Sequence, residues 1–286
     1  VNASMPTSPS TVVPMPDAYA PAEVAVRVRD GGVGKATAPA AALVALAVLA
    51  GAFIALGALF YTVTITAGPN QSAHLGLTRL AGGVAFSLGL VLVVVGGAEL
   101  FTGNNLMAMA WAAGRVTGAQ VLRNWGLVYL GNLAGALGTV VLVLLAGIPQ
   151  MSDGAVGETM VRIARAKVTL DPVSALARGV LCNVLVCLAV WLCMAARSVM
   201  DKILAIVFPI SAFVACGFEH SVANMFFLPL GIALTGSGSD PIAWTGAWGN
   251  LAMVTLGNII GGTGLVALVY WFVYLRHGTQ DREPSR

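Results

Sequence analysis

The sequence predicts an all-α membrane protein of six transmembrane helices, arranged as two inverted three-helix repeats with the second and fifth helices broken. Three observations lead to this class. Of the 286 residues, 58% are hydrophobic and 9% are charged, whereas about 25% of the residues of a soluble domain carry a charge. Six apolar runs reach the length of about 20 residues that a bilayer-spanning helix requires. Sequence patterns of the first half recur in the second, as in many membrane transporters.

The N-terminal segment differs from the rest of the chain in composition. Residues 1–38 are rich in Pro and Ser and contain few large apolar side chains. Such a segment buries too little apolar surface to offset the entropy lost on ordering. We therefore expect a disordered or loosely attached cytoplasmic tail, in which residues 22–31 are compatible with a short helix at the membrane surface.

The transmembrane domain is expected over residues 39–274, with one repeat at about 39–147 and the other at about 173–274. The six expected spans lie at roughly residues 39–66, 78–112, 121–147, 173–196, 203–233 and 244–274. Residues 148–172 are expected to form a partly ordered surface segment, and residues 275–286 a cytoplasmic C-terminal tail. Most of the 15 Lys and Arg residues fall in segments that are cytoplasmic if both chain ends are, which favours this orientation.

The internal repeat is clearest between the third and sixth expected spans. Both contain the pattern N-x3-V-x-L-G-N-x2-G-x2-G, which begins at Asn124 and at Asn250. A weaker echo joins the second and fifth spans, where four residues separate Glu99 from Asn104 and Glu219 from Asn224. Because each half contains an odd number of spans, the second half enters the membrane from the opposite side. The repeat is therefore expected to have inverted topology.

The second and fifth spans are expected to be broken near the middle of the membrane. The second contains Gly96 and Gly97, and the fifth contains Pro209 and Gly217, which weaken a helix. The half-helix after each break presents free N–H groups and the positive end of its dipole. Because the breaks contain no Lys or Arg, we expect them to attract an anion only weakly.

Several polar side chains are expected to hold the breaks. Glu99 and Glu219 are expected to accept hydrogen bonds from the freed backbone N–H groups, because buried carboxylates need partners. Asn104 can also bond freed backbone groups. Asn132 and Asn258, which share one place in the repeat pattern, are expected to pin the breaks or to line the path by bonding across spans.

His220 is the leading candidate for a functional side chain. It lies at membrane depth beside Glu219 and close to Asn224, where ionisable groups are costly and usually mark a pore or a binding site. A satisfied imidazole in the core is the alternative for any single histidine. The nearby break and the repeat favour a pore histidine, which donates a hydrogen bond to an anion or exchanges a proton.

Other candidates are less specific. Lys167 is either a solvated surface lysine or a vestibule residue that attracts a small anion. Five large apolar residues lie near the breaks, and ordinary packing explains any one of them. As a set they are expected to narrow a pore into slits that exclude water. These residues are Phe86, Leu90, Leu100, Phe101 and Phe213.

Composition and motifs argue against other classes of protein. The net charge of +3 is too small to indicate nucleic-acid binding. The four cysteines form no Cys-x-x-Cys pair and no His-Glu-x-x-His motif occurs, so we expect neither an enzyme, a cofactor nor a metal site. A channel for neutral solutes of the aquaporin type remains an alternative, although no Asn-Pro-Ala pair occurs.

The motifs together resemble the formate/nitrite transporter family, over roughly residues 30–275. The segments that carry the resemblance are Glu99–Asn104, Leu181–Trp191, Arg197–Lys202 and Gly217–Met225. The resemblance implies a homopentamer of aquaporin-like protomers, each with its own pore, in the cytoplasmic membrane of a prokaryote. It implies formate as the substrate, with nitrite, hydrosulfide or a short-chain acid as alternatives, and passage assisted by protons.

The resemblance also implies roles for individual residues. His220 corresponds to the central pore histidine, Thr102 to a mobile loop residue that bonds near it, and Asn183 to an asparagine of the fourth span. Lys167 corresponds to a lysine of the vestibule, and Glu219 and Asn224 fall in the motif beside the pore. The family's two constrictions fall at Phe86, Leu90, Phe101 and Phe213.

Overall fold

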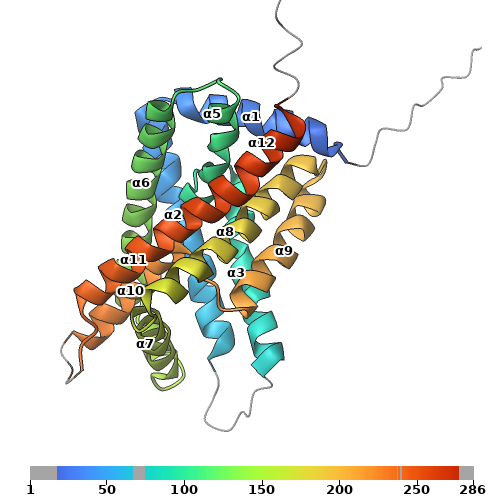
Figure 1. Cartoon of the computed structure of the whole chain (residues 1–286). Helices are drawn as coiled ribbons and strands as arrows, with labels where there is room; N and C mark the ends of the chain where they lie inside the picture. The colour runs from blue at the N-terminus through green and yellow to red at the C-terminus, as the bar shows by residue number, and fades with distance from the viewer. Residues whose placement is uncertain (1–17, 67–74, 237, 239, 277–286) are drawn as a thin grey trace, which may run out of the picture.

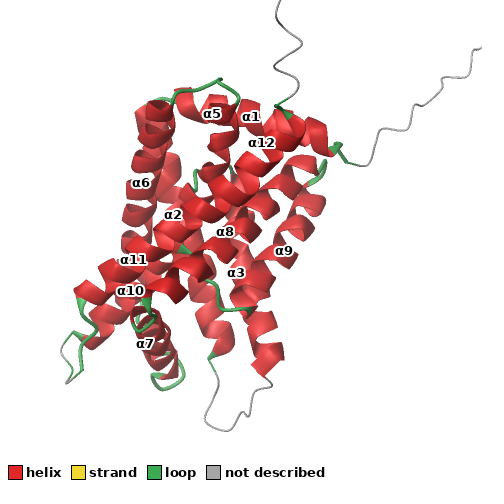
Figure 2. Ribbon diagram, in the orientation of Figure 1, coloured by secondary structure: helices red, strands yellow, loops and turns green. Residues whose placement is uncertain are grey.

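The structure, a computed structural model, describes residues 18–66, 75–236, 238 and 240–276. Within this part of the chain all regular structure is helical (Figure 2). Five helical stretches in it are long and apolar enough to cross a membrane. They are α2 (Ala40–Ile65), α3 (Leu75–Gly96), α6 (Gly118–Leu145), α8 (Pro172–Ala195) and the continuous stretch Trp244–Tyr274, which comprises α11 (Trp244–Ile259), the π-helix η3 (Ile260–Leu268) and α12 (Val269–Tyr274).

The two predicted breaks are confirmed. Helix α3 ends at Gly96, and the chain resumes as α4 (Phe101–Asn104), η1 (Asn105–Met107) and α5 (Ala108–Ala112). Helix α9 (Val199–Ala215) is likewise separated from α10 (Ser221–Thr235). Gly97 and Gly217 adopt φ values of +80° and +70°, which glycine tolerates far better than other residues. Pro209 lies inside α9, so Gly217 and not Pro209 marks the break in the fifth span.

Two segments are more ordered than their composition predicts. The helix expected at residues 22–31 is present and longer than expected: it is α1 (Pro21–Thr37), which is not loosely attached but buries Val24, Val28 and Ala36. The connection expected as a surface segment contains η2 (Ile148–Gln150) and α7 (Ala155–Val168). Helix α7 packs against α10 and buries Met160 and Ala164. Residues 1–17 and 277–286 of the expected tails lie outside the described residues.

The helices pack as two similar groups (Figure 1). In one, α2 lies against α3 and α6, and in the other α8 lies against α9 and α11, while α3 and α9 join the groups. Helices α1, α5 and α12 lie at one end of the bundle, and α7 lies toward the opposite end (Figure 1). The first and last described helices therefore share one end.

Glycines of the repeat pattern explain how closely the helices approach. A Cβ atom at Gly135 of α6 would clash with the carbonyl oxygen of Val48 in α2. A Cβ atom at Gly261 would clash in the same way with the carbonyl oxygen of Val180 in α8. Small residues allow such close packing between helices in lipid. One glycine position of the repeat pattern thus sets equivalent contacts in both halves.

Candidate functional site

Two cavities adjoin the two breaks. The His220 cavity has a volume of about 200 Å³ and is lined by His220, Lys167 and Glu219, among others. The Lys35 cavity has a volume of about 210 Å³ and is lined by Lys35 and Glu99. Each cavity therefore contains a lysine and the glutamate of the adjacent break.

The break between α9 and α10 is held by a buried ion pair. Lys167 Nζ lies 2.9 and 3.0 Å from the two carboxylate oxygens of Glu219. Asn224 Nδ2 donates to Glu219 Oε2 and to Asn250 Oδ1, both at 2.7 Å. Asn250 Nδ2 donates to the Lys167 carbonyl at 2.9 Å. The side chain of Lys167 is 13% exposed, so its reading as a solvated surface lysine is wrong.

The break after α3 has an equivalent network, which sequence reasoning missed. Lys35 Nζ donates to Glu99 Oε1 at 2.7 Å and to Asn104 Oδ1 at 2.9 Å. Asn104 Nδ2 donates to Glu99 Oε2 and to Asn124 Oδ1, and Asn124 Nδ2 donates to the Lys35 carbonyl. One signal could have revealed part of this network, since Asn124 and Asn250 open the same repeat pattern.

These networks correct two expectations. Glu99 and Glu219 were expected to bond freed backbone N–H groups, but their carboxylates bond a lysine and an asparagine instead. The breaks were also expected to lack a basic residue, yet Lys35 and Lys167 reach them from α1 and α7. A buried carboxylate needs a partner such as a cation. Here the two cations, Lys35 and Lys167, come from helices outside the predicted spans.

The backbone groups freed by the breaks are bonded by Asn132 and Asn258. Asn132 Oδ1 accepts from Phe101 N at 3.0 Å, and its Nδ2 donates to the Ala47 and Glu99 carbonyls. Asn258 Oδ1 accepts from Ser221 N at 2.9 Å. Its Nδ2 donates to the Gly179 and Glu219 carbonyls at 2.8 and 3.0 Å. Each asparagine therefore pins one break to a neighbouring span, as expected.

The hydrogen bonds of His220 assign its tautomer. His220 is the N-cap of α10, and its Nδ1 accepts from the backbone N–H of Ala223 at 3.1 Å. Because a backbone N–H can only donate, Nδ1 carries no proton and the neutral ring carries its proton on Nε2. His220 Nε2 therefore donates to Thr102 Oγ1 at 3.0 Å. The Thr102 hydroxyl oxygen is thus the acceptor of this buried hydrogen bond.

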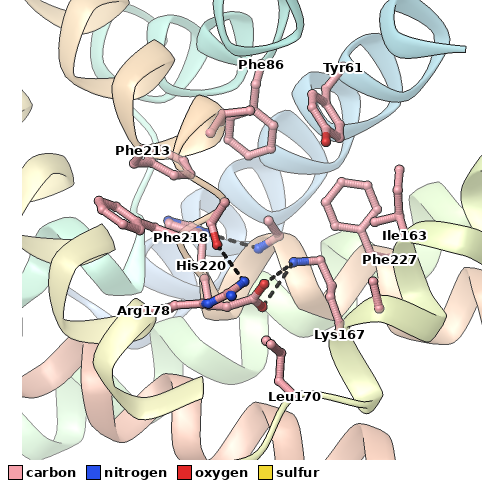
Figure 3. Close-up of a pocket in the computed structure, with 15 residues that line it drawn as sticks. Tyr61, Phe86, Ile163, Lys167, Leu170, Arg178, Phe213, Phe218, His220 and Phe227 are labelled. Carbon is pink, nitrogen blue, oxygen red and sulfur yellow. Dashed lines mark hydrogen bonds and ion pairs between the residues drawn. The ribbon is translucent and has the colours of Figure 1, made fainter. Parts of the chain in front are cut away.

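Apolar side chains separate the two cavities. Phe86 and Phe213 line the His220 cavity, with ring centroids 5.5 Å apart in a T-shaped arrangement (Figure 3). Leu90 and Leu100 line the Lys35 cavity. Phe86 and Leu90 lie on the same face of α3, since residues four apart are neighbours on a helix surface. The two cavities therefore lie about one turn of α3 apart, on the same side of that helix.

Phe101, Asn183 and Thr102 do not line either cavity. The Phe101 ring packs against Tyr129 and Trp125 of α6, with centroids 4.9 and 6.2 Å away, so it belongs to the core in this structure. Asn183 Nδ2 lies 3.2 Å from the Thr102 carbonyl, 2.8 Å from Asn105 Oδ1 and 2.7 Å from the Asn258 carbonyl. Asn183 therefore holds the segment that carries Thr102. Asn105 is a further buried residue of this cluster that the sequence did not single out.

Comparison with known proteins gives a consistent answer. The family model described as "Formate/nitrite transporter" matches residues 22–272. "Formate channel FocA" of Escherichia coli K12 is 42% identical over 91% of this chain and 96% of its own length. "Probable formate transporter" of Methanothermobacter thermautotrophicus is also 42% identical, over 85% of this chain and 92% of its own length.

Solved structures show the same similarity. A "Pentameric formate channel with formate bound" superposes with a TM-score of 0.74 at 40% identity, over 83% of this chain and 98% of that chain. An "FNT family ion channel" superposes with a TM-score of 0.78 at 30% identity, over 88% of this chain and 98% of that chain. The fold is therefore that of these channels over most of the described residues.

Proposed function

The chain belongs to the formate/nitrite transporter family, and we propose that it is a formate channel with one pore in each protomer of a homopentamer. This proposal is carried by the lining of the His220 cavity. His220, which is bonded to Thr102, lines the cavity together with the ion pair of Lys167 and Glu219. The apolar rings of Phe86 and Phe213 line it as well. The arrangement offers a polar group to a small anion and an apolar contact to its neutral acid. The substrate named for the relatives and for one of the solved structures supports formate.

The proposed arrangement in the membrane follows from the two similar helix groups. We propose six crossings, the broken pairs α3–α5 and α9–α10 supplying the second and fifth, in two repeats of inverted topology. We also propose that the protein lies in the cytoplasmic membrane of a prokaryote with both ends inside. The shared end of α1 and α12 supports an even number of crossings (Figure 1).

The proposed permeation path uses protonation of the anion. A bare anion crosses an apolar slit poorly, because moving an ion out of water still costs roughly several kcal/mol after the protein relaxes. A proton taken up from water, or by way of His220, converts formate into the neutral acid, which passes Phe86 and Phe213 and is deprotonated beyond them. Uptake is therefore expected to rise as the pH falls on the side from which formate enters.

The role of His220 can be tested by two substitutions. We expect His220→Asn to keep formate flux and its pH dependence, because asparagine Oδ1 can replace Nδ1 as the N-cap acceptor of α10 and the anion can take its proton from water. His220→Ala also removes the N-cap acceptor and is expected to lower flux about tenfold, equivalent to about 1.4 kcal/mol in the barrier. Formate uptake by proteoliposomes at two pH values measures both. If His220→Asn retained formate flux but lost its pH dependence, the imidazole ring itself would carry the proton.

The substrate is tested by purified protein in liposomes. Uptake of formate, nitrite, acetate and hydrosulfide is measured at two pH values, with protein-free liposomes as the control. We expect formate uptake to be fastest, and faster nitrite uptake would favour the nitrite alternative of the same family. Osmotic shrinkage in stopped flow addresses the neutral-solute alternative. Water or polyol flux without formate flux would contradict the proposed function.

A further inference from the structure

We propose that Arg178 is a specificity-determining residue of the His220 cavity, where its unbalanced positive charge attracts the anion to one mouth of the pore. This inference rests on the proposed function and deepens it. Arg178 lies on α8 and lines the cavity together with Lys167 and Glu219 (Figure 3). Its role follows from the comparison of the two halves, which the repeat makes possible residue by residue.

The backbone hydrogen bonds at the breaks identify the counterpart of Arg178. The Arg178 carbonyl accepts from Glu219 N at 3.3 Å, and the Leu46 carbonyl accepts from Glu99 N at 3.2 Å. The next residues along the chain also correspond, since Gly179 and Ala47 accept from Asn258 and Asn132. Arg178 therefore occupies the position at which the other half has Leu46.

This replacement changes the charge of one cavity only. In the Lys35 cavity the charges of Lys35 and Glu99 cancel in an ion pair. In the His220 cavity Lys167 and Glu219 cancel in the same way, and the hydrogen bonds of His220 assign a neutral ring. Arg178 leaves this cavity with one more positive than negative side chain. A cleft with one sign of charge and low-dielectric walls raises the local concentration of the opposite ion.

The geometry of Arg178 leaves it able to meet an anion. The residue is exposed, and Figure 3 shows its guanidinium beside the contact between Lys167 and the break segment. Its Nη1 donates to the Gly217 carbonyl at 3.3 Å, and this is its one side-chain hydrogen bond within the described part of the chain. A guanidinium has five N–H donors in a fork that matches a carboxylate. Formate is such a carboxylate.

A purely structural role for Arg178 has a matched counterpart in Arg79. Arg79 Nη1 donates to the Ala215 carbonyl at 3.4 Å, close in the chain to the Gly217 carbonyl that Arg178 contacts. Arg79 does not line the His220 cavity. If the carbonyl contact alone mattered, substitution of either arginine would have the same effect. If the charge in the cavity matters, the effect is larger for Arg178 than for Arg79, which lies near the cavity but does not line it.

The test compares Arg178→Gln, Arg178→Lys and Arg79→Gln with the wild type, each checked for its assembled state by size-exclusion chromatography. Initial formate uptake by proteoliposomes is measured against formate concentration at low and high salt. We expect Arg178→Gln to raise KM for formate about 3- to 10-fold at low ionic strength without changing the maximal rate. This is at or below the lower end of the usual range of electrostatic steering, because a single charge is removed. High salt should remove most of this difference, because the Debye length falls from about 10 Å at 0.1 M to about 3 Å at 1 M.

Arg178→Lys should stay within about twofold of the wild type in KM, since it keeps the point charge that steers an anion. Arg79→Gln should raise KM less than Arg178→Gln does, because Arg79 does not line the cavity. Equal KM values and equal salt dependence for Arg178→Gln and the wild type would overturn the inference, as would a lower maximal rate with unchanged KM. If Arg178→Gln does not assemble, Arg178→Leu, which carries the residue of the other half at this position, is measured in the same way. A raised KM at low salt then supports the inference and an unchanged KM overturns it. A wild-type protein that carries no formate overturns the proposed function itself, so the two failures are distinguishable.

Discussion

Lys167→Leu is expected to lower the free energy of unfolding by about 3–5 kcal/mol, the usual cost of removing one partner of a buried ion pair. The substitution leaves the carboxylate of Glu219, which is 6% exposed in its side chain, with Asn224 as its remaining side-chain partner. Formate flux should fall at the same time, because the ammonium group of Lys167, which lines the His220 cavity, is lost. Thermal unfolding in detergent and uptake by proteoliposomes measure the two effects.

The partner substitution separates stability from transport. Glu219→Leu should be comparably destabilising, since it leaves a buried ammonium group. The double variant Lys167→Leu/Glu219→Leu should recover much of the lost stability, because replacing both members of a buried pair by apolar groups is often neutral or stabilising. Its formate flux should remain low. A double variant that recovers both stability and flux would show that the pair is structural only.

The exposed ion pair of Arg165 and Asp240 provides the control. Its side chains are 38% and 78% exposed, and such pairs contribute about 0–1 kcal/mol. Arg165→Ala should therefore change neither the unfolding temperature nor flux by a measurable amount. An effect as large as that of Lys167→Leu would indicate that loss of any ion pair disturbs this end of the bundle.

The broken spans were predictable because their signals are local. Gly97 and Gly217 weaken a helix wherever they stand in the chain, and polar side chains at membrane depth indicate that such a break faces protein or water. The repeat also predicted the roles of Asn132 and Asn258, because two asparagines at equivalent places of the pattern are expected to form equivalent hydrogen bonds across spans. Local composition and internal comparison were sufficient for these elements.

The lysine at the first break could not be recognised in the same way. Lys35 lies in a segment whose composition indicates a tail, and its partner Glu99 is far away in the sequence. Nothing in the residues around Lys35 specifies that contact, which exists only once α1 packs against the bundle. The orientation of Phe101 was hidden for a similar reason. The rotation of a helix after a break decides where its side chains point, and apolar residues alone do not fix that rotation.

The pinning asparagines show how the fold and the site depend on each other. Asn258 fixes the carbonyl of Glu219 and the N–H of Ser221, the residues on either side of His220. It connects them to Gly179 in α8. The position of the ring that bonds Thr102 is therefore set by a residue from a different span. The stability of the break and the position of His220 therefore depend on the same hydrogen bonds of Asn258.

Asn258→Leu is accordingly expected to abolish flux and to destabilise the protein by about 3 kcal/mol or more, since each buried polar group left without a partner costs about 1–3 kcal/mol. The side chain of Asn258 is fully buried, so water cannot replace the three bonds that leucine removes. Unfolding in detergent and formate uptake by proteoliposomes give the two readouts, with the amount of folded protein in the membrane as a third.

Thr255→Val, on the same helix, is the matched control. It removes one side-chain hydrogen bond, that between Thr255 Oγ1 and the Tyr129 hydroxyl, and frees no backbone group. A loss of about 1 kcal/mol or less is expected for it, with flux retained. If Asn258→Leu proved as stable and as active as Thr255→Val, the break would be held by packing alone, and the asparagine would have no part in placing His220.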